Sequence, residues 1–326
     1  MHIHLQSPDN DPLFDFSPDQ WQEAAARAGT LGQGHNISIG RTQADCAAAL
    51  QTAEILFGDT GVIRAQIPFQ APQLKIIQAT MAGIDGLVPL NWLPPGVQLW
   101  SNRGVHAAKA GEFAIMAILM LASRMPVFAT NQRTGRWAKQ YGSVLAGRRL
   151  TVIGLGALGA SGAQHAKNFG MHVTGVRTGT TPHPACDTVI TEADLDRVLP
   201  DTEFLLIATP STPATRNMLS RHRLASLPKG AGVINIGRGA LLDQDALCDL
   251  LDTGHLGGAI LDVFTPEPGP PGHRLWTTPN LIMSPHTCAD DPRTYNAFTL
   301  DLFFANLRAL NAGQTPPTLV DPTRGY

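Results

Sequence analysis

A glycine-rich turn places the strongest constraint on how this chain can fold. The sequence Gly154-Leu155-Gly156-Ala157-Leu158-Gly159 directly follows the apolar segment Leu150–Ile153, a predicted strand. In such a turn the first glycine permits the tight bend, the second lets the backbone approach a pyrophosphate, and the third lets the next helix pack closely. Because unpaired N–H groups at a helix start attract phosphate, we predict dinucleotide contacts at Gly154, Gly156, Ala157, Leu158 and Gly159.

After Gly147 the sequence alternates between short apolar segments and helical or looped connections. We predict strands at Leu150–Ile153, His172–Val176, Phe204–Ala208, Gly232–Ile236, Gly258–Val263 and Asn280–Met283. Thr191 with Asp194 resembles a capping box, and Asp243 should open a helix that Gly254 can close. The alternation is typical of a parallel, doubly wound sheet covered on both faces, so we expect a Rossmann-type α/β domain.

The first hundred residues show a similar but weaker alternation. Candidate strands are His2–Leu5, Glu54–Phe57, Leu74–Gln78 and Val97–Ser101, with an intervening helix at Asp19–Ala28. A longer helical pattern runs from Ala107 to Ser123 and stops before Pro126, which cannot continue a helix. The last helix, about Pro292 to Leu310, is amphipathic and should return to pack on the N-terminal region.

The length of 326 residues suits two domains. We expect a dinucleotide-binding domain over residues 105–288. A second, discontinuous, flavodoxin-like α/β domain is expected from residues 1–104 and 289–326, and it would bind the substrate. The active site is expected between the two domains, where closure would exclude water.

Composition excludes several classes of partner. The chain is 43% hydrophobic and 15% charged, as in globular proteins, and its net charge of −2 offers no attraction to nucleic acid or to an anionic membrane. The apolar run Phe113 to Ala122 is about half the length that a bilayer requires, so we interpret it as a buried helix. The N-terminus does not resemble a secretory signal. We therefore expect a soluble protein.

The cysteines indicate a reducing compartment. Cys46, Cys186, Cys248 and Cys288 lie far apart in the sequence and form no C-x-x-C pair. This spacing suits neither a zinc site nor a disulfide framework, and a cytoplasmic location is the simplest expectation. His2 and His4 form a candidate metal pair, but without a third ligand they are more simply strand residues, and we expect no metal.

The residues that follow the second predicted strand, His172–Val176, decide whether the glycine turn binds NAD or NADP. NAD enzymes usually carry Asp or Glu there for the ribose hydroxyls. Here Arg177-Thr178-Gly179-Thr180-Thr181 contains no carboxylate. A guanidinium can pair with the 2′-phosphate of NADP through two hydrogen bonds, and Thr178 can add a hydroxyl donor. This favours NADP; the alternatives are an exposed loop arginine and NAD.

Three segments end predicted strands with residues suited to chemistry. Arg238 follows one strand and is flanked by Gly237 and Gly239, which give the backbone room beside a ligand. Glu267 and His286 follow the next two strands. Open α/β sheets bind ligands at this end of their strands. An arginine, a carboxylate and a histidine could bind an anionic substrate and transfer a proton.

The same segments resemble the signature blocks of the D-isomer-specific 2-hydroxyacid dehydrogenases, which include the glyoxylate/hydroxypyruvate reductases. The similar stretches are LLIATPSTPATRN, INIGRGALLDQDAL, AILDVFTPEP and LWTTPNLIMSPH. The resemblance is good from about Gly147 to His286 and looser before it. It implies a hydride transfer between NAD(P)H and a small 2-keto or 2-hydroxy acid, with Arg238, Glu267 and His286 as the catalytic residues.

The roles implied by this resemblance agree with the chemistry of the side chains. Arg238 presents a planar fork for the substrate carboxylate and can polarise the keto oxygen. His286 would donate a proton to that oxygen during reduction. Glu267 would hold the other ring nitrogen and favour the protonated ring.

The resemblance also implies further binding residues. Cofactor contacts are expected from Thr209, Pro210, Thr215, Ile236, Arg238, Asp262 and His286. Asp262 would face the nicotinamide amide, although a structural role in a turn is nearly as plausible. Met81, Ala82 and Gly83 resemble the loop that binds the substrate carboxylate through backbone N–H groups, together with Arg238 and His286. Asn102 and Arg103 are weaker candidates.

Two wider alternatives stay open from the sequence. By analogy with the family, the helix from Ala107 to Ser123 would make a homodimer contact, although an intramolecular core would suit its apolar run equally. A dinucleotide-sensing regulatory protein could also keep this fold and act through partner binding. The presence of Arg238, Glu267 and His286 together favours an enzyme. Met81 in the substrate loop and Thr287-Cys288 after the histidine depart from common members and leave the side chain of the substrate open.

Overall fold

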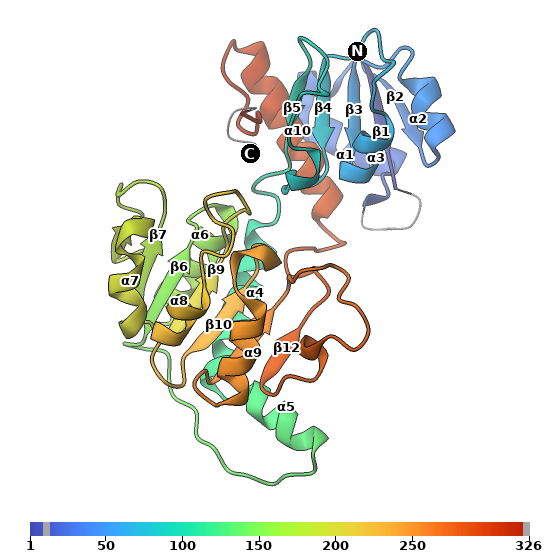
Figure 1. Cartoon of the computed structure of the whole chain (residues 1–326). Helices are drawn as coiled ribbons and strands as arrows, with labels where there is room; N and C mark the ends of the chain where they lie inside the picture. The colour runs from blue at the N-terminus through green and yellow to red at the C-terminus, as the bar shows by residue number, and fades with distance from the viewer. Residues whose placement is uncertain (9–13, 322–326) are drawn as a thin grey trace. The chain divides into compact units, whose positions relative to one another are not determined.

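The computed structural model describes residues 1–8 and 14–321 and divides the chain into two compact units. The first unit contains Met1–His106 together with Asp290–Tyr326, and the second contains Ala107–Ala289 (Figure 1). Each unit is built around one parallel β-sheet. The expected α/β fold class is therefore confirmed.

The first unit has a five-stranded sheet with the order β2-β1-β3-β4-β5. All of its strand pairs are parallel. This 2-1-3-4-5 order is that of flavodoxin-like domains. The strands are β1 (His2–Gln6), β2 (Asn36–Gly40), β3 (Ile55–Gly58), β4 (Ile76–Ala79) and β5 (Gln98–Trp100).

Helices from both ends of the chain cover this sheet. They are α1 (Pro18–Ala28), α2 (Gln43–Ala49), α3 (Thr60–Ala65) and α10 (Tyr295–Asn311). Figure 1 shows α10, in red, among the blue elements of this unit. Leu300, Phe303 and Phe304 of α10 are buried against Trp21 of α1 and the sheet. The predicted return of the last helix is thus confirmed.

The second unit has a seven-stranded parallel sheet with the order β12-β11-β10-β9-β6-β7-β8. Counted from β6, its order contains the 3-2-1-4-5-6 arrangement of Rossmann domains. The strands are β6 (Arg149–Ile153), β7 (His172–Val176), β8 (Thr188–Ile190), β9 (Phe204–Ile207), β10 (Gly232–Asn235), β11 (Gly258–Leu261) and β12 (Leu281–Met283).

Helices lie on both faces of this sheet. They are α4 (Ala107–Ala122), α5 (Met125–Arg133), α6 (Ala157–Asn168), α7 (Leu195–Val198), α8 (Arg221–Ser226) and α9 (Gln244–Asp252). Successive strand residues point to opposite faces. Accordingly, Leu205 packs in the cluster with α8 and α9, whereas Leu206 packs in the cluster with α4 and α6. Both faces of the sheet are therefore buried.

Short 3₁₀ turns complete the two units. They are Gly29–Gly32 and Asp85–Leu87 in the first unit, and Glu192–Asp194, Leu199–Asp201, Gly239–Leu241 and Arg274–Trp276 in the second.

The local predictions have different outcomes. Asp243 caps α9 by accepting from the Ala246 N–H, and Gly254 follows that helix with a φ of 68°, as predicted. The capping box at Thr191 is wrong, because its side chain makes no cap hydrogen bond and a 3₁₀ turn follows it. The buried helix at Phe113 to Ala122 is only half right, since Met116 is 43% exposed and Leu119 38% exposed.

In residues 1–8 and 14–321, none of the helices alone has the length and apolarity to cross a membrane. The pair α4 and α5 passes that test jointly, but it is bent by 66° at the break.

Candidate active site

The glycine turn between β6 and α6 has the geometry that its sequence requires. Gly154 has a φ of 94°, which strongly disfavours side chains, and a Cβ there would lie 2.9 Å from backbone atoms of Ala208 and Thr209. At Gly159 a Cβ would lie 1.9 Å from the Gly154 carbonyl oxygen. The first glycine thus makes the bend and the third brings α6 against the strand.

The second glycine leaves open space where a phosphate group can approach. Gly156 precedes α6 and carries no side-chain cap, and a Cβ built there would meet nothing within 4 Å. The N–H groups of the first helical turn have no partner inside a helix. The helix α6 is 12 residues long, and its exposed N-terminus fits a pyrophosphate.

Arg177 directly follows β7, the strand beside the glycine motif. Arg177 and Thr178 are exposed, and the Arg177 N–H donates to the Ile190 carbonyl of β8. Its guanidinium makes no ion pair with another side chain in residues 1–8 and 14–321. The position is open to a ligand phosphate.

Arg238 lies in a loop at the carboxyl end of β10, and close packing explains its flanking glycines. A Cβ on Gly237 would lie 2.7 Å from the Thr209 carbonyl oxygen, and one on Gly239 would lie 2.1 Å from the Phe264 carbonyl carbon. These glycines therefore let the loop fit against its neighbours rather than provide free space. Arg238 is half-buried, and its Nη1 donates to the Gly237 carbonyl at 2.7 Å.

Asn235 at the end of β10 was not singled out from the sequence. Its side chain is fully buried; its Nδ2 donates to the Arg238 carbonyl at 2.9 Å, and its Oδ1 accepts from the Gly237 N–H at 3.0 Å. The signal available was an amide in an otherwise apolar, buried strand.

Glu267 and His286 form a hydrogen-bonded pair. The Nδ1 atom of His286 lies 2.8 Å from Oε2 of Glu267, whose Oε1 accepts from the Phe264 N–H at 2.8 Å. The hydrogen bond to Glu267 raises the pKa of His286 above its usual value, against the opposing effects of burial and of Arg238. Burial raises the pKa of Glu267, but its two hydrogen bonds and the positive charges of His286 and Arg238 together hold it below the usual value. The pair therefore favours a charged imidazolium.

Asp262 holds the turn that carries His286. Its carboxylate accepts hydrogen bonds from the Ser284 hydroxyl at 2.7 Å, from the Thr287 N–H at 3.0 Å and from the Cys288 N–H at 3.1 Å. The Asp262 carbonyl also accepts from the His286 N–H at 2.9 Å. His286 itself has a φ of 58°, an uncommon conformation for a residue with a side chain.

The fold brings Arg238, Glu267 and His286 to one edge of the second unit. They follow β10, β11 and β12, which are successive parallel neighbours, so their carboxyl ends adjoin. Arg238 is near enough to act electrostatically on both partners of the pair. The side chain of His286 is 47% exposed, which leaves its other ring nitrogen open to a substrate.

The other candidate residues lie in several places. Thr209 is half-buried after β9 and Pro210 is exposed, while the Thr215 hydroxyl donates to the Pro210 carbonyl at 2.8 Å. Ile236 is buried in a core cluster of the second unit. Met81, Ala82 and Gly83 form a half-buried loop after β4 in the first unit, and Asn102 contacts that loop through its N–H to the Met81 carbonyl at 3.1 Å.

The two N-terminal histidines are engaged with protein groups. His2 Nε2 and His4 Nδ1 lie 2.7 and 2.8 Å from the Ser38 hydroxyl. In the described part of the chain, no cluster of three or more His, Cys, Asp or Glu residues is arranged to hold a metal ion.

Comparison with known proteins decides the family. The family model for the D-isomer specific 2-hydroxyacid dehydrogenase, NAD binding domain, matches residues 115–288. The chain belongs to the D-isomer specific 2-hydroxyacid dehydrogenases. It is therefore an NAD(P)-dependent oxidoreductase of a family that acts on small 2-hydroxy or 2-keto acids, and the resemblance noted in the sequence is confirmed.

Similar proteins span nearly the whole chain. A glyoxylate reductase of Korarchaeum cryptofilum is 29% identical over 94% of this chain and 90% of its own length, and one of Thermofilum pendens is 30% identical over 80% and 79%. Crystal structures of family members from Aeromonas salmonicida and Xanthobacter autotrophicus each have a TM-score of 0.82. They are 26% and 27% identical and cover 98–99% of this chain and 99% of theirs.

Proposed function

We propose that this D-2-hydroxyacid dehydrogenase reduces a short 2-keto acid, such as glyoxylate or hydroxypyruvate, with NADPH. The observation that carries the proposal is the His286–Glu267 hydrogen bond of 2.8 Å beside Arg238 at the ends of neighbouring strands. The glyoxylate reductases among the similar proteins support this substrate class.

Arg238 is proposed to bind the substrate. Its guanidinium can form two parallel hydrogen bonds with a carboxylate, or bind one carboxylate oxygen and polarise the keto oxygen. NADPH, when bound, supplies the hydride that reduces the keto carbon. Arg238 holds that carbon in a fixed place, since a displacement of about 1 Å can cost roughly a hundredfold in rate.

His286 is proposed as the proton donor during reduction and the acceptor during oxidation. Glu267 fixes Nδ1 as the ring nitrogen that faces the carboxylate, so Nε2 is left for the substrate oxygen. Because the pKa of His286 is raised, its charged form persists to higher pH than that of an isolated histidine. The arrangement therefore favours the acid needed for reduction.

The preference for NADPH rests on Arg177. An exposed guanidinium without an ion-pair partner in the described residues, and a following loop without carboxylates, suit a 2′-phosphate. The family member from Xanthobacter autotrophicus was crystallised with NADPH. In this unit we propose cofactor contacts from the glycine turn and from Thr178, Thr209, Pro210, Thr215, Ile236 and Asp262, and substrate contacts in the first unit from Met81, Ala82 and Gly83.

NADPH consumption with a panel of 2-keto acids tests the proposed activity. We expect turnover with glyoxylate or hydroxypyruvate, and its absence with every member of the panel would contradict the proposal. For the cofactor, Arg177→Ala should weaken NADPH binding by roughly 10- to 100-fold, the range of a charged hydrogen bond, and leave NADH unchanged. Arg197→Ala, at a residue 82% exposed in the same unit, is the matched control. Equal use of both cofactors by the wild type would refute the preference.

We also propose a homodimer formed through the second unit. Between Met116 and Val144 a series of apolar side chains is exposed: Met116, Leu119, Met125, Trp137, Tyr141 and Val144. The Trp137 side chain is 93% exposed and that of Tyr141 84%, values unusual for aromatic residues. Exposed aromatic and methionine side chains are enriched at protein–protein interfaces.

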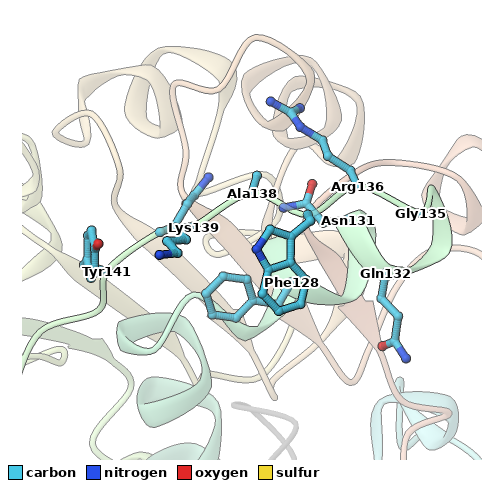
Figure 2. A pocket seen from close by; sticks show the side chains of 10 residues that line it. Phe128, Asn131, Gln132, Gly135, Arg136, Ala138, Lys139 and Tyr141 are labelled. Atoms are coloured by element: carbon cyan, nitrogen blue, oxygen red, sulfur yellow. The ribbon is translucent and has the colours of Figure 1, made fainter.

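The same segment also forms an apolar hollow of about 600 Å³. Figure 2 shows Phe128 at its centre, with Tyr141 toward one end and Arg136 directed away from the ring. The exposed rings of Trp137 and Tyr141 line this hollow, and two copies related by a twofold axis would cover the same apolar surface in both subunits. A second copy of this chain is therefore the proposed occupant.

Sedimentation of the purified protein tests the dimer. We expect the wild type to sediment as a dimer and Trp137→Ser with Tyr141→Ser to shift toward the monomer. A double change at the exposed residues Phe169 and Trp276, outside this segment, should leave the dimer intact. A monomeric wild type at micromolar concentration would refute this proposal.

A cytoplasmic location is proposed from the cysteines. Cys46, Cys186 and Cys248 are free thiols, and burial raises the pKa of Cys46 and of Cys186 to about 11. Cysteines that form no disulfide suit a reducing compartment. Fractionation of cells that express the full chain, with recovery outside the cytoplasm, would contradict it.

A further inference from the structure

Two buried polar residues are backbone neighbours at the ends of β10 and β11. Asn235 is the last residue of β10, and Asp262 follows the last residue of β11. The Asp262 N–H donates to the Asn235 carbonyl at 3.0 Å, and both side chains are 0% exposed. Buried polar groups of this kind are costly unless hydrogen-bonded, so their partners show what they stabilise.

Within residues 1–8 and 14–321, the side chain of Asn235 forms hydrogen bonds only with the loop of Arg238. The amide accepts from the Gly237 N–H and donates to the Arg238 carbonyl, so it bonds on both sides of the peptide before Arg238. These two bonds need one acceptor and one donor at the same position. Asparagine supplies both, whereas aspartate would place an oxygen against the Arg238 carbonyl.

In the part of the chain that the structure describes, the Asp262 carboxylate accepts hydrogen bonds only from the turn of His286. The donors are the Ser284 hydroxyl two residues before it and the N–H groups of Thr287 and Cys288 after it. An ionised carboxylate only accepts, which matches a set made entirely of donors. The turn also needs this support because His286 has a positive φ, which costs free energy unless its surroundings enforce it.

We propose that Asn235 and Asp262 act as positioning residues, which hold the loops of Arg238 and His286 in the geometry that the reaction requires. Asp262 then serves the proton donor through the backbone of its turn, in addition to its proposed cofactor contact. This inference rests on the proposed function of Arg238 and His286. It adds that two residues without substrate contact control the rate.

Asp262→Asn separates a positioning role from a cofactor contact. The amide keeps one acceptor but places an NH₂ group where Oδ2 faces the Cys288 N–H. We expect kcat to fall by roughly tenfold or more, as a displaced catalytic group should cause, and to fall by a larger factor than the Kd for NADPH rises. A large rise in that Kd with an unchanged kcat would overturn the proposal.

Asn235→Ala tests the other loop. The expected result is a loss of kcat/KM for the keto acid of roughly tenfold or more, from displacement of Arg238. Asn306→Ala is a matched control: Asn306 is also 0% exposed, and its amide makes two hydrogen bonds with Thr318 in the first unit. We expect the control to lose stability and keep its kcat/KM. Equal kinetic losses in both variants would overturn the positioning role.

Ser284→Ala is the replacement variant for this test if Asp262→Asn does not fold. It removes one donor to Asp262 from a half-buried side chain, and we expect the same kinetic change at smaller size. A Ser284→Ala enzyme identical to the wild type in kcat and in the pH dependence of kcat would count against the proposal.

An NMR titration of the imidazole protons of His286 does not require an active enzyme. The resonances are assigned by comparison with His286→Asn. In Asp262→Asn the displaced ring should lose part of its hydrogen bond to Glu267, the main cause of its raised pKa, and the lost charge of Asp262 acts in the same direction, so the pKa of His286 should fall. An unchanged titration would overturn the positioning role. If the wild type consumed no NADPH while the titration changed as expected, the proposed activity alone would fail.

Discussion

The Nδ1 atom of His286 lies 2.8 Å from the Oε2 atom of Glu267, and this contact favours the charged form of the proposed proton donor. It raises the pKa of the ring, whereas Arg238 and burial lower it. Three strands deliver these groups, and the backbone N–H of Phe264 fixes the second oxygen of Glu267. The fold therefore holds the Glu267–His286 pair in position.

The first prediction concerns pH. Because the pKa of His286 is raised, the reductase rate should stay high as pH increases and fall only as pH passes through that raised value; the oxidation rate should rise over the same interval. Glu267→Gln should move both transitions to lower pH. Above the transition, the reductase rate should then be about tenfold lower for every pH unit by which the transition has moved.

The pH dependence of kcat measures this effect. Glu192→Gln, at a surface carboxylate paired with Arg223, is the control. Coincident profiles for wild type and Glu267→Gln would contradict the role of Glu267.

The second prediction concerns the fork of Arg238. Arg238→Lys keeps the positive charge but cannot form two parallel hydrogen bonds with a carboxylate. We expect kcat/KM for the keto acid to fall by roughly 10- to 100-fold, which corresponds to one charged hydrogen bond of about 1.5–3 kcal/mol. Steady-state kinetics measure it, with Arg221→Lys at an exposed ion pair with Asp249 as the control. A lysine variant with wild-type kcat/KM would show that charge alone suffices.

The third prediction concerns the glycine turn. In Gly159→Ala the new methyl group would lie 1.9 Å from the Gly154 carbonyl oxygen, so α6 must move away from β6. We expect a loss of about 1–3 kcal/mol in the free energy of unfolding, as for other overpacked sites. We also expect NADPH to raise the melting temperature much less than in the wild type, because the helix start is displaced.

Gly86→Ala is the control for this measurement, since its methyl group would meet only the end of the Arg64 side chain at 3.6 Å. Thermal melting with and without NADPH compares the three proteins. A Gly159→Ala protein with wild-type stability and a wild-type response to NADPH would contradict the packing role of this glycine.

The elements around the site could be predicted because their patterns are local. Apart from Asn235, the run Gly232–Ile236 is apolar and is bounded by glycines, and its strand β10 is buried. The glycine motif specifies its own turn. Two edge strands were missed, Asn36–Gly40 and Thr188–Ile190. Each of these strands pairs with another strand on one side only, and most of its side chains are at least partly exposed. They therefore lack the apolar run that marks a central strand.

Other features of the site depend on contacts distant in sequence. The roles of Gly237 and Gly239 could not be derived from the motif alone, because the backbone that excludes a Cβ belongs to Thr209 and Phe264. The hydrogen bonds of Asp262 reach 22 to 26 residues along the chain, and the positive φ of His286 arises in the turn that they hold. Sequence spacing predicted which residues meet but not how their loops are held.

NADPH oxidation by the wild type and by His286→Asn, with glyoxylate and hydroxypyruvate, tests the account most directly. His222→Asn, at an exposed histidine of the same unit, is the control. We expect the wild type and the control to reduce at least one of the two acids. In His286→Asn kcat should fall by roughly 10²- to 10⁴-fold, the usual contribution of a general acid, while NADPH binding is retained. Turnover of His286→Asn at the wild-type rate would contradict the account.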